Sequence, residues 1–180
     1  ASGSAALSRM AEAKGAVELI LADCYVRRDR IALVAFRGRK AEVLLPPTRS
    51  LSRARKSLAE LPGGGGTPLG SAIDEGRMLA DQVRRSGGVP LLVFLTDGRG
   101  NIARDGSADR TAARRDADDA ARALRLQGFR SLVIDISGTP ADAARLLATA
   151  LAATYVHLPH ADAGQIAAAV SAAMKAGAAP

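Results

Sequence analysis

Residues 90–101 read PLLVFLTDGRGN, and this stretch decides the fold class. Residues 90–95 form a short run that is apolar on both faces, and it stops at Thr96-Asp97-Gly98. A strand that is apolar on both faces is typical of a sheet that helices cover on each side. We therefore predict a central strand over residues 90–95, with a polar turn at its carboxyl end.

The chain on either side of this strand alternates between strands and helices. Further strands are predicted at residues 31–36, 41–45, 131–136 and 154–157. Helices are predicted at residues 5–28, 50–61, 68–85, 109–127, 140–152 and 163–175, with Ser50 as the N-cap of the second. The first two strands are joined by the turn Arg37-Gly38-Arg39 and are predicted to be antiparallel, and Pro46-Pro47 is expected to end the second. The alternation predicts an α/β fold: an open, doubly wound, mostly parallel sheet with helices on both faces.

The sequence has no linker and no internal repeat, so residues 1–180 are predicted to form a single domain. The chain opens with the polar stretch Ala1-Ser-Gly-Ser4, which runs directly into the first helix. In an open α/β sheet a strand normally precedes such a loop. We expect residues 1–4 to be the tip of a strand-to-helix turn, the domain to be truncated at its N-terminal end, and the complete sheet to have about six strands.

The composition is that of a folded globular protein. The 180 residues are 48% hydrophobic and 24% charged, which argues against a disordered or fibrous chain. The single cysteine, Cys24, cannot form an internal disulfide or hold a structural zinc by itself. No apolar run has the length of a membrane span, and the first residues do not resemble a signal peptide, so a cytoplasmic location is expected.

The formal net charge is +7, which raises the question of a polyanionic partner. Five scattered aromatic residues are too few for the stacking platforms of single-strand nucleic-acid binders, so nucleic acid is the least favoured partner. A solvated basic surface and a docking face for an acidic protein segment both remain open.

Three polar loops are predicted to meet at one end of the sheet. They are Ser2-Gly3-Ser4, the glycine run 63–66 with Thr67, and Thr96-Asp97-Gly98. Hydroxyl and carboxylate oxygens suit Mg²⁺ or Mn²⁺, and an ion with so little protein charge around it could accept a carboxylate from a partner. Taken singly, each of these residues could instead cap a helix or shape a turn.

Together the elements Ser2-x-Ser4, Gly66-Thr67-Pro68 and Leu95-Thr96-Asp97-Gly98 resemble the metal-ion-dependent adhesion site of von Willebrand factor A, or integrin I-like, domains. That motif begins Asp-x-Ser-x-Ser, so its leading carboxylate would fall immediately before Ala1. The resemblance implies that Ser2, Ser4 and Thr67 are hydroxyl ligands, and that Asp97 is a ligand directly or through water.

A longer resemblance covers most of the chain. The stretches at residues 1–15, 23–26, 30–37, 61–68 and 95–101 are similar to the C-terminal domain of the magnesium chelatase D-subunit family. The family implies a non-catalytic domain that links the AAA+ ATPase ring of the I subunit to the H subunit, which inserts Mg²⁺ into protoporphyrin IX for chlorophyll or bacteriochlorophyll. ATP would then enter only through the parent complex, and an acidic linker of the same chain is a further candidate partner.

Other functions have weaker support in the sequence. A nucleotide-binding enzyme would need a lysine after the glycine run, but Thr67 is followed by Pro68. His157 and His160 are three residues apart and could form a zinc pair or act as acid and base, although structural roles are favoured. The same fold could also serve another AAA+ complex, such as cobalt chelatase.

Overall fold

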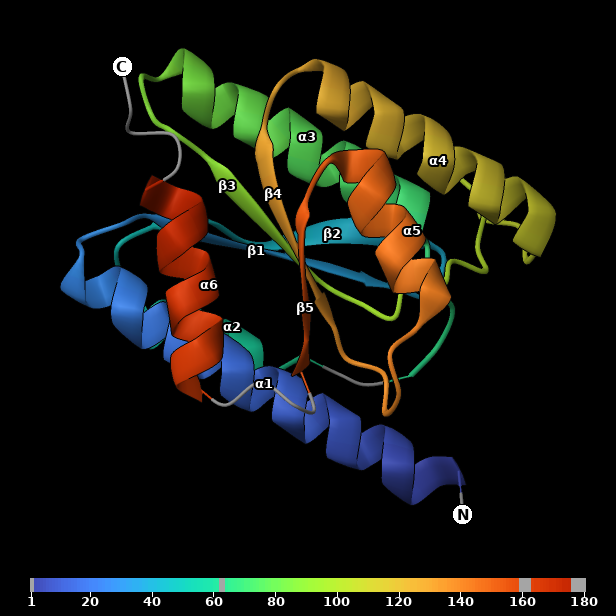
Figure 1. The fold of residues 1–180 in the computed structure, drawn as a ribbon, viewed down its shortest axis with the longest axis horizontal. Coiled ribbons are helices and arrows are strands. Elements are labelled where there is room, and N and C mark those ends of the chain that lie inside the picture. Colours follow the sequence, from blue (N-terminus) through green and yellow to red (C-terminus); the bar gives the residue numbers. More distant parts are fainter. Residues whose placement is uncertain (1, 62–63, 159–162, 176–180) are drawn as a thin grey trace.

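The computed structural model describes residues 2–61, 64–158 and 163–175, with side chains except those of residues 2–10, 163 and 167. The helices and strands alternate in the predicted order (Figure 1). They are α1 (Ser2–Val26), β1 (Ile31–Arg37), β2 (Lys40–Thr48), α2 (Leu51–Ala59), α3 (Leu69–Arg85), β3 (Leu91–Leu95), α4 (Arg110–Leu126), β4 (Arg130–Asp135), α5 (Asp142–Leu151), β5 (Thr154–His157) and α6 (Ala163–Lys175).

The strands form two sheets. β1 pairs with β2 in antiparallel orientation, and β3, β4 and β5 form a parallel sheet in that order. Both orientations confirm the prediction. Within the described residues no strand joins β1 to β3, so β3 lies at the edge of its sheet and most of its side chains are only half-buried. The prediction that residues 90–95 form a central strand is therefore wrong for the described strands. The strand expected before Ala1 stays a prediction.

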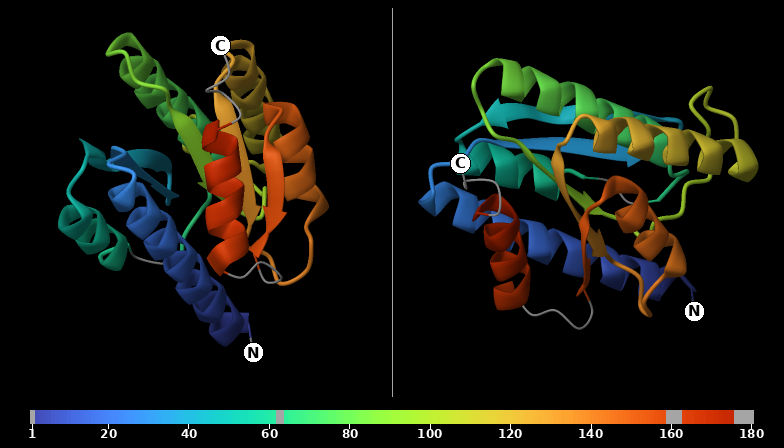
Figure 2. Two further views of the ribbon diagram at one scale, coloured as in Figure 1. Left: turned by 60° about the vertical axis from the view of Figure 1, so that its left-hand side comes forward. Right: turned by 45° about the horizontal axis from the view of Figure 1, so that its top comes forward.

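Helices cover both faces of the strands, as predicted (Figures 1 and 2). β4 shows this most clearly, since its residues 131–135 are all buried. Val133 belongs to a core cluster with residues of α3, α4 and α5, whereas Leu132 and Ile134 belong to a cluster with α1 and α6. A third cluster joins α1 and α2 to β2. The alternation of side chains along β4 therefore fixes which helices lie on which face.

Two predicted boundaries are wrong. β2 continues through Pro46 and Pro47 to Thr48, because β2 has a partner on one side only and an edge strand tolerates residues without an N–H donor. The segment Ser2–Ser4 is helical and not a loop. The residues that follow, Ala5 to Leu7, have high helix propensity and extend α1 back to Ser2.

No helix in the described part of the chain is long and apolar enough to cross a membrane.

Candidate metal centre

The candidate site lies at the end of the parallel sheet where β3, β4 and β5 finish. Thr96, the first residue after β3, is 3% exposed, and its N–H donates to the carbonyl of Ile134 at 3.0 Å. Its hydroxyl Oγ1 accepts a hydrogen bond from Gly98 N at 3.0 Å. Thr96 is therefore held inside the protein, and the chain emerges at Asp97.

Gly98 makes the turn after Asp97 possible. It has a φ of +76°, and a Cβ atom at this position would lie 2.3 Å from the backbone N of Ala144 in the first turn of α5. A side chain fits neither the backbone conformation nor the space. The sequence Asp97-Gly98 thus places a half-buried carboxylate at the mouth of the sheet, directly against α5.

Asp97 keeps one carboxylate oxygen available. Its Oδ1 accepts a hydrogen bond from Arg99 N at 3.0 Å, and in the described part of the chain no hydrogen bond reaches Oδ2. The pairing within the loop fixes the carboxylate in one orientation. An oxygen without a partner at the protein surface is what a cation or a bridging water requires.

Thr67 is tied to the same loop by Asn101. The N–H of Thr67 donates to Asn101 Oδ1 at 2.6 Å, and the carbonyl of Thr67 accepts from Asn101 N at 3.1 Å. The carbonyl also accepts from Leu69 N at 3.0 Å. Asn101 therefore holds both polar groups of the Thr67 backbone, while the threonine hydroxyl makes no hydrogen bond to the residues described.

The glycines before Thr67 allow a close approach to a second loop. A Cβ at Gly66 would lie 2.6 Å from the carbonyl oxygen of Gly38 and 2.4 Å from Cγ1 of Ile102. A Cβ at Gly65, where φ is +95°, would lie 3.3 Å from Gly38 N. The glycine run is thus pressed against the β1–β2 turn, and its role is to let the backbone pass there on the way to Thr67.

The structure accordingly joins by hydrogen bonds the two loops that carry Thr67 and Asp97, two of the four predicted ligands. Ser2 and Ser4 lie in the first turn of α1, and their side chains are outside the described part. The N-terminal end of α1 lies at the same end of the molecule as the carboxyl ends of β3 to β5 (Figures 1 and 2).

Asp135, at the end of β4, is a second carboxylate at this end of the sheet. Both of its oxygens already accept hydrogen bonds from the protein. It is fully buried, and its oxygens accept from Ala141 N at 2.8 Å, Ser137 N at 2.9 Å and the hydroxyl of Tyr155 at 2.6 Å. Burial has the largest single effect on its pKa and raises it, but these hydrogen bonds together outweigh burial and hold the pKa below its ordinary value. Asp135 therefore organises the loop from β4 to α5 and has no oxygen left for a metal.

The donors at this end of the sheet suit one kind of ion. No group of three or more His, Cys, Asp or Glu side chains that could hold a metal occurs among the described residues. A zinc or calcium site of the usual kind is thus not formed by them. The hydroxyl of Thr67 and the carboxylate of Asp97 are hard oxygen donors that fit Mg²⁺ or Mn²⁺, ions that keep several waters.

His157 and Cys24 each contact a residue outside the loops that carry these donors. His157 Nε2 is 2.8 Å from the carbonyl oxygen of Ser137, which fits the structural alternative, and His160 lies outside the described residues. Cys24 is half-buried late in α1, and burial is the main cause that raises its thiol pKa. A raised pKa makes a thiol a poorer nucleophile at neutral pH.

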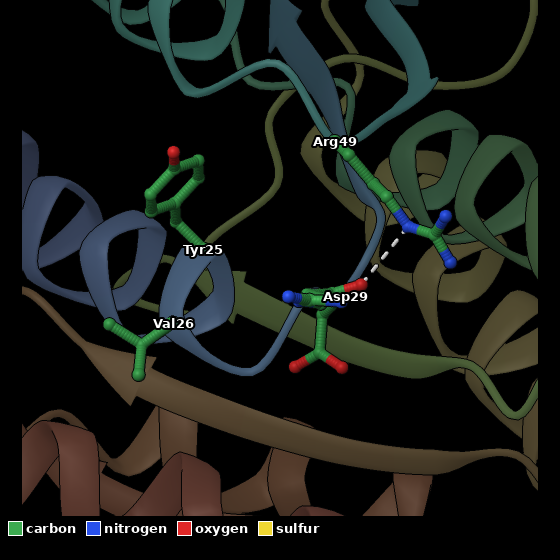
Figure 3. Close-up of a pocket in the computed structure, with 5 residues that line it drawn as sticks. Tyr25, Val26, Asp29 and Arg49 are labelled. Atoms are coloured by element: carbon green, nitrogen blue, oxygen red, sulfur yellow. Dashed lines mark hydrogen bonds between the residues drawn. The ribbon is translucent and has the colours of Figure 1, made fainter.

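A hollow of about 400 Å³ lies elsewhere, where α1 passes into β1 (Figure 3). Tyr25 and Val26 project from the end of the helix on one side, and Asp29 and Arg49 lie on the other. Arg49 Nε donates to the carbonyl of Arg28 at 3.1 Å. Since β1 begins here and ends at the glycine run, this hollow is at the opposite end of β1 and takes no part in the candidate metal centre.

Comparison with known proteins identifies the family. A family model described as von Willebrand factor type A domain matches residues 1–99. The chain belongs to the von Willebrand factor type A family. Solved structures agree on the fold of this type A domain. A conserved hypothetical protein, BatB, from Bacteroides thetaiotaomicron aligns over 92% of the chain and 88% of its own, with a TM-score of 0.69 and 18% identity. The SpRpn10 VWA domain aligns over 86% of the chain and 80% of its own, with a TM-score of 0.63 and 13% identity.

This type A domain is also similar in sequence to subunits of magnesium chelatase. It is 51% identical over 174 residues to the magnesium-chelatase 60 kDa subunit of Cereibacter sphaeroides, covering 97% of the chain. It is 42% identical to the magnesium-chelatase 67 kDa subunit of Chlorobaculum parvum, covering 92% of the chain. The chain spans 31% and 28% of the lengths of these two relatives. The resemblance seen in the sequence is confirmed for this domain.

Asn101 is the residue that sequence reasoning missed. It belongs to the stretch 95–101 that carries the resemblance, but no role was predicted for it. A polar residue with both a donor and an acceptor, just after a glycine turn at the end of a buried strand, is a signal for a side chain that binds a neighbouring backbone.

Proposed function

We propose that this type A domain is a non-catalytic docking domain of a magnesium chelatase D subunit. In this role it couples the ATPase I subunit to the H subunit for the insertion of Mg²⁺ into protoporphyrin IX in chlorophyll or bacteriochlorophyll synthesis. The similarity to magnesium-chelatase subunits over nearly the whole chain supports the assignment to this complex. A cytoplasmic location and the use of ATP only through the parent complex belong to the same proposal.

The observation that carries the docking role is the Asn101 contact that joins the Thr67 loop to the Asp97 loop. In the proposal Ser2, Ser4 and Thr67 provide hydroxyl ligands and Asp97 provides a carboxylate, directly or through water. A bound Mg²⁺ or Mn²⁺ would supply an electrophilic centre that takes a carboxylate of the partner. The protein's own contribution is to fix the donors: Asn101 sets the Thr67 backbone, Arg99 N holds one oxygen of Asp97, and Gly98 keeps the loop against α5.

The test is capture of the purified I subunit by the protein in Mg²⁺ and in EDTA. The Thr67→Ala variant removes one hydroxyl donor, and Thr111→Ala, at an exposed position in the first turn of α4, is the matched control. We expect binding to fall in EDTA and in Thr67→Ala, with unchanged circular dichroism, and to persist in Thr111→Ala. Binding that is indifferent to EDTA and to Thr67→Ala would refute a metal-bridged contact.

A second candidate keeps the fold and changes the complex, namely an AAA+-linked assembly such as cobalt chelatase. A fold does not determine a function, so the type A fold by itself does not single out one complex. Capture of the ATPase subunit of cobalt chelatase in preference to the I subunit of magnesium chelatase would favour this alternative.

A further inference from the structure

Four basic residues lie on segments next to the loops that carry Thr67 and Asp97. Arg37 ends β1, Arg39 lies in the β1–β2 turn, Lys40 begins β2, and Arg99 follows Asp97. All four are exposed. Among the residues that the structure describes, none of their side chains has an ion-pair or hydrogen-bond partner.

Backbone contacts place the β1–β2 turn beside the candidate site. Gly38, in the middle of the turn, is the residue against which Gly65 and Gly66 are pressed, and Gly66 directly precedes Thr67. A Cβ at Gly106 would lie 3.7 Å from Cβ of Arg39, so the stem of Arg39 runs along the loop that follows Asn101. On the other side of Thr67, a Cβ at Gly100 would lie 3.6 Å from its carbonyl oxygen, next to Arg99.

Two positive charges face each other at this turn, which lowers the stability of the β1–β2 hairpin. Arg37 is directly opposite Lys40 in the antiparallel pair of β1 and β2. Like charges directly opposite each other destabilise a hairpin, so the arrangement has no benefit for folding. Glu42, two residues from Lys40 on the same face of β2, forms no ion pair within the described residues. Asp105 and Asp97 each accept backbone hydrogen bonds within their own loops, and Asp135 is buried. A fourth arginine of this region, Arg104, is different, because it pairs with Asp74 and Asp116.

We propose that Arg37, Arg39, Lys40 and Arg99 form a cationic rim that recognises a segment of a partner protein with several Asp or Glu residues. One carboxylate of that segment reaches the ion of the proposed function, on which this inference rests, and the flanking carboxylates pair with the rim. Charges at the rim of an interface act mainly on the association rate and on its salt dependence. The rim therefore selects an acidic segment over a neutral segment with a single carboxylate.

The experiment uses two synthetic peptides and the purified protein. The acidic peptide has one central Asp with Glu residues on both sides, and the matched peptide has Gln in place of each Glu. Binding is measured by fluorescence anisotropy in Mg²⁺ at low and physiological salt. The rim variant is Arg39→Gln with Arg99→Gln, and the control is Arg53→Gln with Arg125→Gln, two exposed arginines of α2 and α4 that leave the same net charge.

We expect the rim variant to bind the acidic peptide on the order of threefold to tenfold more weakly than the control variant, as the loss of two exposed ion pairs implies. The matched Gln peptide should bind more weakly to the unmodified protein and should not distinguish the two variants. Equal affinity of the rim and control variants for the acidic peptide would overturn the inference, and so would an oligonucleotide of equal total charge that binds the unmodified protein more tightly than the acidic peptide does.

The two proposals fail in different ways. If EDTA and Thr67→Ala abolish binding of the acidic peptide but the rim variant binds like the control, the docking function stands and the rim is refuted. If the rim variant is weaker but EDTA and Thr67→Ala have no effect, the metal-bridged function is refuted and recognition of the acidic segment is electrostatic alone.

Discussion

The contact between Asn101 and Thr67 gives the sharpest prediction for the site. Replacing Asn101 with alanine removes the acceptor of the 2.6 Å hydrogen bond from Thr67 N. The backbone bonds from Asn101 N and Leu69 N to the Thr67 carbonyl do not involve the side chain, so they remain. The substitution thus frees one half of the Thr67 backbone and leaves the other half in place.

The expected loss of stability is small. A hydrogen bond of this kind contributes about 1 kcal/mol, and a donor left without a partner costs about 1–3 kcal/mol when it is fully buried. Asn101 and Thr67 are only partly buried, so water can replace the lost acceptor and the lower value applies. For a domain of this size, about 1 kcal/mol corresponds to a decrease in Tm of about 2–4 °C.

The effect on metal binding should be larger than the effect on stability. Mg²⁺ requires near-ideal octahedral geometry with oxygen distances of about 2.0–2.1 Å, so a hydroxyl that is free to move is a poor ligand. We expect Asn101→Ala to weaken Mg²⁺-dependent capture of the I subunit almost as much as Thr67→Ala does, although the Thr67 hydroxyl is still present.

Isothermal titration with Mg²⁺ and thermal unfolding, on the same samples, separate the two effects. Asn101→Asp is the matched variant, because it keeps an oxygen that accepts from Thr67 N, and it should retain metal binding. The reasoning is refuted if Asn101→Ala binds Mg²⁺ like the unmodified protein, or if Asn101→Asp is as defective as Asn101→Ala.

Two further predictions concern the structure that supports the site. Gly98→Ala introduces a Cβ 2.3 Å from Ala144 N at a φ of +76°, so we expect a decrease in Tm and loss of metal binding, while Gly138→Ala, where a Cβ meets nothing within 4 Å, is the control. Asp135→Asn should lower the free energy of unfolding at pH 7 by on the order of 2 kcal/mol, since it disrupts hydrogen bonds to a buried carboxylate. The lowered pKa of Asp135 means that its stabilisation is complete above the unfolded pKa of about 3.9 and is lost as the pH falls through the folded value. Denaturant unfolding from pH 7 to pH 3 should therefore show the variant approaching the unmodified protein as the pH falls, and a constant difference would contradict this account.

The sequence predicted the elements well where local signals and burial agree. The strands predicted at 90–95 and 131–136 match β3 (Leu91–Leu95) and β4 (Arg130–Asp135) to within one residue at each end. Ser50 accepts the predicted capping hydrogen bond from Arg53 N at 3.3 Å. Local signals failed where tertiary context overrides them. Proline normally ends a strand. Pro46 and Pro47 are tolerated in β2 because β2 has a partner strand on one side only, so an N–H is not needed on its open side.

The candidate site was predictable in part for a similar reason. Topology places the carboxyl ends of parallel strands together, so the neighbourhood of Thr67 and Asp97 follows from the order of the elements. The hydrogen bond from Thr67 N to Asn101 Oδ1 does not follow from the order of the elements, because it joins residues 34 positions apart through one side chain and a backbone N–H. The saturation of Asp135 is equally invisible in the sequence, where Asp135 and Asp97 are both acidic residues at the end of a strand.

The net charge of +7 does not say where the positive charge lies on the surface, so the composition could not distinguish among the candidate partners. Six of the arginines have an Asp partner within the described residues. They are Arg27, Arg77, Arg84, Arg85, Arg104 and Arg122. The excess positive charge therefore belongs to the basic residues without such a partner, and the β1–β2 turn brings three of these to the glycine run beside Thr67. A basic surface spread evenly over the protein would attract any polyanion. Basic side chains close to the Thr67 and Asp97 oxygens instead favour a protein segment with several carboxylates, because one carboxylate can bind the ion and the others can pair with the basic side chains.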